Sequence, residues 1–359
     1  MSRLGLLTLC SSLIALVIFF SRKERKTIPA GEGLMINKEW LKSTKSPVTP
    51  EEFVRPADQT FLTFPEWYLV FSPEEQASYF KNKTATSFPF MSHTAQIWES
   101  YRIVNDQIKD NFPYNAGYHF MIWVIGTSAS VEYTIKAWYE TVVGRITDTK
   151  NVVTEEDQFN ATFTQDYVDF IKDRPWYEFD FKSRLISLWS HPLLGDINAR
   201  KIERRYVLTS ELLMKYLYGK LIGLGTQTVY DAALPTTEVL VGTLPSERTD
   251  YKVIAEYPDK SALISLPRYD KFNAAICELA RKGVSFREIA GNTSAILITI
   301  LAPSDSKTDF NKARIIFRQP IASNPAVTRV ALATQVKDLQ QLIVQLEDAH
   351  VNIEHIFDF

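Results

Sequence analysis

A chain of 359 residues with 45% hydrophobic residues is long enough for two domains with substantial cores. Its 40 basic residues are balanced by 42 acidic ones, which argues against a nucleic-acid-binding protein, because such proteins carry a clustered basic excess. The two cysteines, Cys10 and Cys277, provide neither a disulfide framework nor a zinc-binding Cys-x-x-Cys pair.

The first predicted element is an apolar segment, Leu4 to Phe20, that contains no charged residue. Its 17 residues are near the lower limit for a helix that crosses about 30 Å of hydrocarbon. Signal peptidase sites end in small residues, whereas this segment ends in Ile-Phe-Phe and is followed by the basic sequence SRKERK. We therefore predict an uncleaved single-pass anchor with its basic flank over residues 1–26. The excess of basic residues after the segment places the body in the cytoplasm; an exported body is the alternative.

A connector over residues 27–50 leads into a mainly helical domain, predicted over residues 51–230. TPEE and SPEE have the form of capping boxes, with Thr49 and Ser72 as the N-cap residues. Both sequences therefore predict that a helix begins there.

Two further helices are expected in this domain. Thr154 predicts the start of the first, which carries aromatic residues on one face and ends before Pro175. The second covers Tyr206 to about Ile222 and is predicted to end at the glycines that follow.

Aromatic residues are concentrated in two clusters of the helical domain. The first contains Phe61, Phe64, Trp67, Tyr68 and Phe71, and the second contains Trp176, Tyr177, Phe179 and Phe181. We interpret both as core, since aromatic side chains dominate ordinary protein interiors. The functional alternative is an apolar ligand cavity or a surface that rests on a bilayer. The candidate ligand-binding residues are Glu66, Trp67, His119, Trp123, Glu132 and Tyr133.

The C-terminal part of the chain changes to alternating strands and helices. Residues 231–250 are rich in Pro, Ser and Thr and predict a linker. Residues 251–359 then show the order β-α-β-β, further strands and α-β, with a hairpin predicted at Gly291-Asn292. This order favours a ferredoxin-like βαββαβ module. The predicted fold class is α+β: an N-terminal transmembrane helix, the helical aromatic-rich domain and the ferredoxin-like module.

Residues 111–131 contain no formally charged side chain, and three interpretations compete for them. A second membrane span has sufficient length, but only Phe120 to Ile125 is strongly apolar. A buried core element that runs into an amphipathic helix and lines a cavity is the interpretation we favour, with Glu132, Lys136 and Glu140 along one helix face.

The third interpretation is a serine hydrolase, whose nucleophile sits at a tight turn between a strand and a helix. The sequence FMIWVI-GTSAS-VEY has that appearance, with Ser128 at the turn and His191 as a candidate base. The nucleophile elbow G-x-S-x-G, however, needs glycine where this chain has Ser130. Ser128 with His191 is therefore kept as the enzymatic alternative.

Other catalytic and binding motifs are missing from the sequence. The five histidines form no HExxH or HxH pair, so no metal site is expected. There is no GxxxxGK[ST] or GxGxxG sequence to bind nucleotide phosphates, and no cofactor is expected. We interpret the basic cluster Arg200, Lys201, Arg204 and Arg205 as a solvated face, with anionic lipid as its alternative contact.

Three sequences, FPEWYLVFS with Glu66 and Trp67, GTS-x-x-VEY with Ser128, Glu132 and Tyr133, and RPWYEFDF, resemble an uncharacterised family of bacterial membrane-associated proteins. The resemblance covers roughly residues 60–230. It implies a bacterial source and membrane association. It implies no catalytic residue, since the family has no established activity.

These features predict a non-enzymatic binding or assembly module at the bacterial inner membrane. Residues 4–20 are expected to contact membrane lipid, and the C-terminal domain is expected to bind a protein partner or a second copy. The alternatives are a membrane-anchored serine hydrolase that uses Ser128, and a carrier of a lipid or other apolar ligand in the aromatic-rich domain.

Overall fold

The computed structural model describes residues 36, 38–42, 47–148, 153–190, 198–229, 235–245, 251–306, 310 and 312–359, and only the backbone of residues 224–229. The predicted anchor, residues 4–20, and the candidate base His191 lie outside the described residues. Among the helices that are described, none is both long and apolar enough to cross a membrane.

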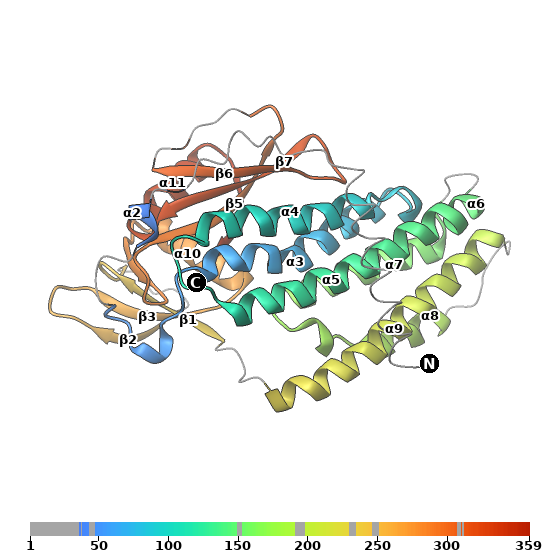
Figure 1. Cartoon of the computed structure of the whole chain (residues 1–359), viewed down its shortest axis with the longest axis horizontal. Coiled ribbons are helices and arrows are strands. Elements are labelled where there is room, and N and C mark those ends of the chain that lie inside the picture. The colour runs from blue at the N-terminus through green and yellow to red at the C-terminus, as the bar shows by residue number, and fades with distance from the viewer. Residues whose placement is uncertain are drawn as a thin grey trace. The chain divides into compact units, whose positions relative to one another are not determined.

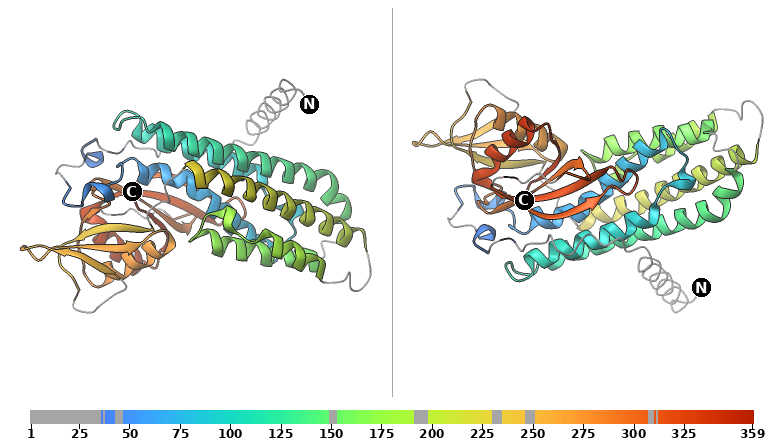
Figure 2. Two further views of the ribbon diagram at one scale, coloured as in Figure 1. Left: turned by 90° about the horizontal axis from the view of Figure 1, so that it is seen from below. Right: turned by 90° about the horizontal axis from the view of Figure 1, so that it is seen from above.

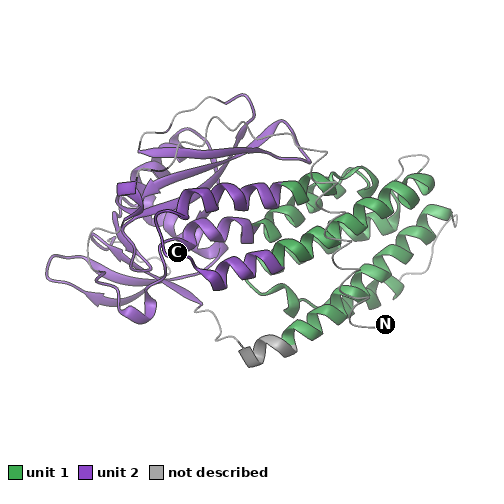
Figure 3. Ribbon diagram, viewed as in Figure 1, with its two compact units in different colours: residues 1–25, 68–95, 125–232 green, residues 26–67, 96–124, 233–359 purple. Residues whose placement is uncertain are grey.

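Two compact units make up the described part of the chain, and each draws on separate stretches of sequence (Figure 3). Unit 1 contains residues 68–95 and 125–232, and unit 2 contains residues 26–67, 96–124 and 233–359. The sequence predicted one helical domain over residues 51–230, whereas the structure divides these residues between the two units. Three helices pass from one unit to the other: α3 (Gln59–Phe80), α4 (Phe90–Ile108) and α5 (Ala116–Tyr139) (Figure 1).

Unit 1 is helical. Besides its parts of α3, α4 and α5, it contains η2 (Ala85–Ser87), the π-helix η3 (Glu140–Gly144), α6 (Arg145–Thr147), α7 (Glu155–Ile171), η4 (Trp176–Glu178), α8 (Phe181–Ser190) and α9 (Ala199–Val229). The predicted start of α7 is confirmed. The Thr154 hydroxyl accepts from the backbone N–H of Asp157, and the Asp157 carboxylate accepts from the backbone N–H of Thr154, which completes a capping box.

Two other predicted helix ends are wrong. Ser72 does not begin a helix, because SPEE lies inside α3, which continues through Pro73. The helix predicted to end at Gly223 continues as α9 to Val229. Gly219 and Gly223 instead let α9 approach Tyr177, since a Cβ at Gly219 would lie 3.3 Å from the Tyr177 carbonyl oxygen.

The predicted aromatic core is confirmed in each unit. In unit 2, the ring of Phe64 packs edge-on against Phe317 and Phe357, with centroids 5.0 and 5.8 Å away. In unit 1, Phe163 and Phe181 are buried together with leucines of α9. Large rings thus fill both interiors.

Two four-stranded antiparallel sheets form most of unit 2 (Figures 1 and 2). The first contains β1 (Thr236–Val241), β2 (Lys252–Glu256), β3 (Ala262–Pro267) and β4 (Phe286–Ile289), with α10 (Asp270–Arg281) between β3 and β4 in sequence. The second contains β5 (Ala295–Pro303), β6 (Ala313–Pro320), β7 (Val327–Gln335) and β8 (Asn352–Phe357), with η5 (Val336–Asp338) and α11 (Leu339–Asp348) before β8. Their strand orders are β2-β3-β1-β4 and β6-β7-β5-β8. Each half is therefore a βββαβ unit with the same topology, so unit 2 contains an internal repeat around one shared core.

This topology corrects the prediction of a single ferredoxin-like βαββαβ module. Residues 236–241, which were assigned to the linker 231–250, form β1, a central strand of the first sheet. Gly291 and Asn292 do not join a hairpin, because β4 and β5 belong to different sheets. The other strands and helices expected after residue 251 are present.

The beginning of unit 2 is tied to both sheets. The Glu288 carboxylate on β4 accepts hydrogen bonds of 3.0–3.1 Å from the backbone N–H groups of Val48 and Thr49 and from the Thr49 hydroxyl. TPEE consequently forms only the short 3-10 helix η1 (Glu51–Phe53), preceded by Pro50 without a side-chain cap. The Thr60 hydroxyl on α3 donates to the carbonyl of Phe357 and accepts from the N–H of Leu297, which joins α3 to the second sheet.

Candidate functional site

The six predicted ligand-binding residues do not form one site. Glu66, Trp67, His119 and Trp123 belong to unit 2, whereas Glu132 and Tyr133 belong to unit 1. Each group has its own partners, so the two units present separate candidate sites.

Glu66 lies beside the phenol of Tyr118, with 2.5 Å between the hydroxyl and a carboxyl oxygen. The same hydroxyl lies 2.9 Å from that of Thr63, which already donates its hydrogen to the carbonyl of Gln59. The single phenolic hydrogen cannot serve both neighbours, so both contacts are hydrogen bonds only when Glu66 carries a proton. Burial raises the pKa of Glu66, which favours that protonated form.

Arg268 and Asp358 lie close enough to Glu66 in unit 2 to act on its charge. The Asp358 carboxylate accepts from Arg55 at 2.8 Å and from Nε of Arg268 at 3.2 Å, and it also accepts from the Thr237 hydroxyl. Burial by itself would raise the pKa of Asp358, but the two guanidinium groups hold it below its usual value. Sequence analysis selected Glu66 from FPEWY but missed its neighbours Tyr118, Arg268 and Asp358, because they come from distant parts of the chain.

The remaining candidates of unit 2 are packed against other rings. Trp67 lies on His355 with centroids 3.6 Å apart. His119 is buried, accepts or donates a 2.8 Å hydrogen bond with the Tyr101 hydroxyl and stacks on Tyr114. Burial lowers the pKa of His119, which favours the neutral form of its ring. Trp123 packs on Trp98 but stays 55% exposed.

Tyr133 belongs to a buried polar network in unit 1. Its hydroxyl lies 2.7 Å from that of Ser72 and accepts from Gln76, and the Ser72 hydroxyl lies 2.7 Å from Nδ1 of His93. Nε2 of His93 faces Glu75 at 3.4 Å. A serine, a histidine and a carboxylate are the residue types of a hydrolase, but Ser72 and His93 are 1% and 0% exposed. The network is therefore part of the buried core of unit 1. Sequence analysis did not find it, because Ser72 was interpreted as an N-cap residue.

Glu132 takes part in a second network, formed by four alternating charges on α5 and α9. Lys136 lies 2.9 Å from Glu132 and 2.8 Å from Glu211, and Lys215 lies 3.2 and 3.3 Å from the same two carboxylates. Burial opposes ionisation of Glu132, but the two ammonium groups lower its pKa to about 2. The sequence showed only the spacing of Glu132 and Lys136. The other two charges, Glu211 and Lys215, come from α9.

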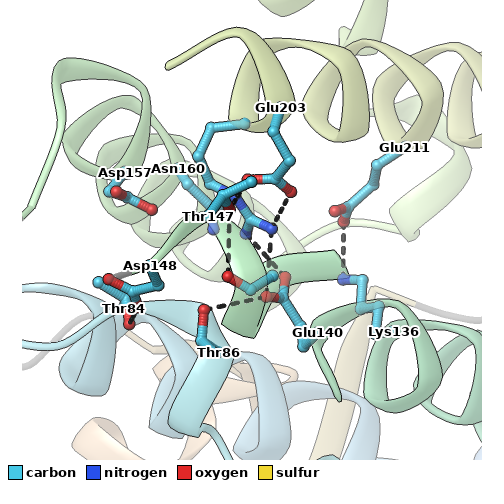
Figure 4. Close-up of polar contacts among 12 residues, drawn as sticks. Thr84, Thr86, Lys136, Glu140, Thr147, Asp148, Asp157, Asn160, Glu203 and Glu211 are labelled. Carbon is cyan, nitrogen blue, oxygen red and sulfur yellow. Dashed lines mark hydrogen bonds and ion pairs between the residues drawn. The ribbon is translucent and has the colours of Figure 1, made fainter. Parts of the chain in front are cut away.

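The basic cluster on α9 is not a solvated face, contrary to the sequence-based interpretation. Arg200, Arg204 and Arg205 are 5%, 2% and 7% exposed. Arg204 contacts Glu140 through two hydrogen bonds of 2.7 and 3.1 Å and also pairs with Glu203 (Figure 4). Burial by itself lowers the pKa of Arg204, yet these two carboxylates raise it above its usual value.

The same network joins four segments of unit 1. Arg200 pairs with Asp157 on α7 and Glu203 on α9, and the hydroxyls of Thr86 and Thr147 donate to Glu140 and Glu203 (Figure 4). Gly144, the last residue of the π-helix η3, supplies the space for this arrangement, because a Cβ there would overlap the Glu140 carboxylate.

The structural context predicted for Ser128 is wrong. FMIWVI is not a strand, since residues 116–139 form one continuous helix, α5. Ser128 lies on an exposed side of that helix, with no strand-to-helix turn to present it. The predicted buried core element is only partly buried, because Ile122 and Ser130 are enclosed but Phe120 and Trp123 are more than half exposed.

Thirteen large apolar side chains in the described part of unit 1 are exposed, and we refer to them together as the outer apolar face. It consists of Ile135, Trp138, Val142, Ile146, Ile186, Trp189, Ile202, Tyr206, Leu213, Met214, Leu217, Tyr218 and Leu221, each at least 40% exposed. On α9, Ile202, Tyr206, Leu213 and Leu217 recur at helical spacing and share one side. Lys136 on α5 pairs with Glu211 on α9, and these two helices lie side by side in Figures 1 and 2. Unit 1 thus has buried ion pairs beside its apolar core, and it also leaves many large apolar side chains exposed.

Comparison of the chain with protein-family models, with curated proteins and with solved structures finds no match. In the part of the chain that the structure describes, no group of three or more His, Cys, Asp or Glu residues is placed to bind a metal ion.

Proposed function

We propose that this protein is a membrane-anchored binding or assembly module whose helical unit rests its outer apolar face on the lipid bilayer. In this proposal, residues 4–20 form the single-pass anchor in a bacterial inner membrane, with the body in the cytoplasm. The C-terminal half would then supply the surface for a partner.

The observation that carries the proposal is the outer apolar face. Soluble proteins rarely expose contiguous apolar patches larger than a few hundred Å², and larger ones mark protein or membrane contacts. Trp138 and Trp189 on this face are 64% and 58% exposed, and Tyr206 is 67% exposed. Tryptophan and tyrosine are the residues enriched at the level of the lipid headgroups.

The length of the chain before the described part supports lipid as the contact. Residue 36 is fixed in unit 2, because the buried N–H of Ile36 donates to the Gln107 side chain. Only residues 21–35 separate it from the proposed anchor, and such a segment spans at most about 50 Å when fully extended. The body is therefore held within reach of the bilayer, where weak apolar contacts are strengthened by the high local concentration.

Vesicle flotation of the chain without residues 1–26 tests the proposal. We expect this shortened chain to float with vesicles of phosphatidylethanolamine and phosphatidylglycerol. The double variant Trp138→Ser/Leu217→Ser should bind at least about tenfold more weakly, because each side chain buried in an apolar phase contributes ~1.5–3 kcal/mol. Failure of the shortened chain to bind vesicles would exclude the outer apolar face as a lipid contact.

Val253→Ser/Ile254→Ser is the matched control, since these β2 residues are 38% and 41% exposed but lie in unit 2. It should leave flotation unchanged. The anchor is tested separately by alkaline carbonate washing of membranes. The full chain should stay in the pellet, whereas the chain without residues 1–26 should be released; retention of both would contradict the anchor.

An apolar-ligand carrier is the second candidate, and one observation favours it. Leu185, Ile186, Trp189 and Ser190 on α8 line a shallow, open depression of about 370 Å³. Organic extraction of the purified chain followed by mass spectrometry should release a stoichiometric lipid if the protein carries one. An extract without such a lipid would remove this candidate and leave bilayer contact in place.

A further inference from the structure

Arg268 in unit 2 is an arginine that is fixed in place and yet has unused hydrogen-bond donors. Its side chain is only 18% exposed. Nε donates to Asp358 at 3.2 Å, and the guanidinium carbon lies 5.2 Å from the centre of the Tyr269 ring. Its two Nη groups donate to no acceptor in the part of the chain that the structure describes.

The neighbouring arginine shows the contrast. Arg55 uses its Nη groups for Asp358, the carbonyl of Phe359 and the carbonyl of Thr236. Arg55 therefore stabilises the end of β8, whereas Arg268 is held by its Nε and keeps its planar pair of Nη groups available. Such a fork matches two oxygens of a carboxylate or phosphate group.

The surroundings favour an anion. Arg268 and Arg55 share the Asp358 carboxylate, Glu238 is a further charged neighbour of Arg55, and burial favours the neutral form of Glu66. Glu66, Tyr118, Arg268 and Tyr269 each keep a part of their surface exposed. Tyr269 has a φ of 64°, an unfavourable value for a residue with a side chain, and it places its ring against the guanidinium.

We propose that Arg268 is the anchoring residue of an oxyanion site, which binds a phosphate or carboxylate group of a ligand through both Nη groups. The site is formed where α3, the start of α5 and the connection from β3 to α10 meet within unit 2. It is independent of the outer apolar face, and its ligand is either a free metabolite or a lipid headgroup.

Isothermal titration of the full chain in detergent, at constant ionic strength in chloride, tests the site with inorganic phosphate and with acetate. We expect saturable binding of at least one of them. Arg268→Lys, which keeps the charge beside Asp358, and Arg268→Gln should each weaken binding at least tenfold. The control Arg281→Gln removes an exposed arginine of α10 that pairs with Glu347, and it should bind as the unchanged protein does.

Two further measurements make the result decisive. Far-ultraviolet circular dichroism should show that Arg268→Lys is folded, so that a loss of binding can be attributed to the loss of the two Nη groups. Soluble short-chain phosphatidic acid distinguishes the sources: binding much tighter than that of phosphate indicates a lipid headgroup, and equal binding indicates a free oxyanion. Absence of saturable binding to the unchanged protein, or equal binding by Arg268→Lys, would overturn the proposal.

Discussion

The Tyr118 hydroxyl and the Glu66 carboxyl group approach to 2.5 Å, in a chain of hydrogen bonds that is one hydrogen short unless Glu66 is protonated. Burial raises the pKa of Glu66, so the fold favours the neutral form of the carboxyl group in the FPEWY sequence. Its nearest partners are oxygen atoms rather than cations.

The first prediction concerns the pH dependence of stability. Burial raises the pKa of Glu66, so its contribution to stability is fully present below the unfolded-state pKa and is lost as pH rises through the folded-state value. Glu66→Gln supplies a neutral donor at every pH and should remove this loss. In urea unfolding from pH 4 to 8, the free energy of unfolding of the variant should rise relative to that of the unchanged protein by about 1 kcal/mol, the net value of a typical hydrogen bond. A constant difference between the two over that range would contradict the protonation assignment.

The second prediction concerns the π-helix. Gly144→Ala should destabilise the protein by about 1–3 kcal/mol, because the added methyl group displaces the Glu140 carboxylate that pairs with Arg204. Gly117→Ala is the matched control: no atom lies within 4 Å of the added group, and alanine should be neutral or stabilise α5 by up to about 1 kcal/mol. Thermal unfolding of both variants measures the difference. Equal melting temperatures would show that the space at Gly144 is not needed.

The third prediction concerns the four alternating charges between α5 and α9. Lys215→Met leaves Glu132 and Glu211 with one ammonium group in place of two. The pKa of Glu132, now about 2, should rise. A carboxyl group whose pKa is lowered in the folded state stabilises the fold at every pH above its unfolded-state pKa. The free energy of unfolding of the variant near pH 7 should therefore be lower by about 1 kcal/mol, because solvent screens these partly exposed charges. The two stability curves should converge as pH falls through about 2.

Lys282→Met is the control for this experiment, because Lys282 pairs with a single exposed residue of its own helix, Glu278. Its effect should be smaller and nearly independent of pH. If Lys215→Met behaved in the same way, the two helices would not depend on their shared charges.

Local signals in the sequence were reliable where neighbouring residues decide the structure. The capping box at Thr154 and the alternating strands after residue 251 follow from interactions within a few residues. Ser72 failed as a helix start because its hydroxyl is engaged by His93 and Tyr133, which tertiary folding brings close. The arginines of α9 failed for the same reason: their carboxylate partners on η3 and α7 are 43 to 64 positions away.

The candidate sites show the same limit. Glu66 and Glu132 could be selected from the sequence because they stand within unusual runs. Arg268 and Asp358 could not, because nothing near them distinguishes a fixed arginine from an exposed one. The strand order of the two halves could not be predicted either. The sequence of β1 resembles that of a linker, and only its pairing with β3 and β4 identifies it as a strand.

Unit 2 is assembled from three stretches of chain that are separated by parts of unit 1. The Thr60 hydroxyl that bridges β5 and β8, and the backbone N–H groups at Val48 and Thr49 that bind Glu288, come from the earliest of these stretches. The sheets therefore cannot be transplanted, by gene fusion or by evolution, as a self-sufficient cassette starting near residue 233.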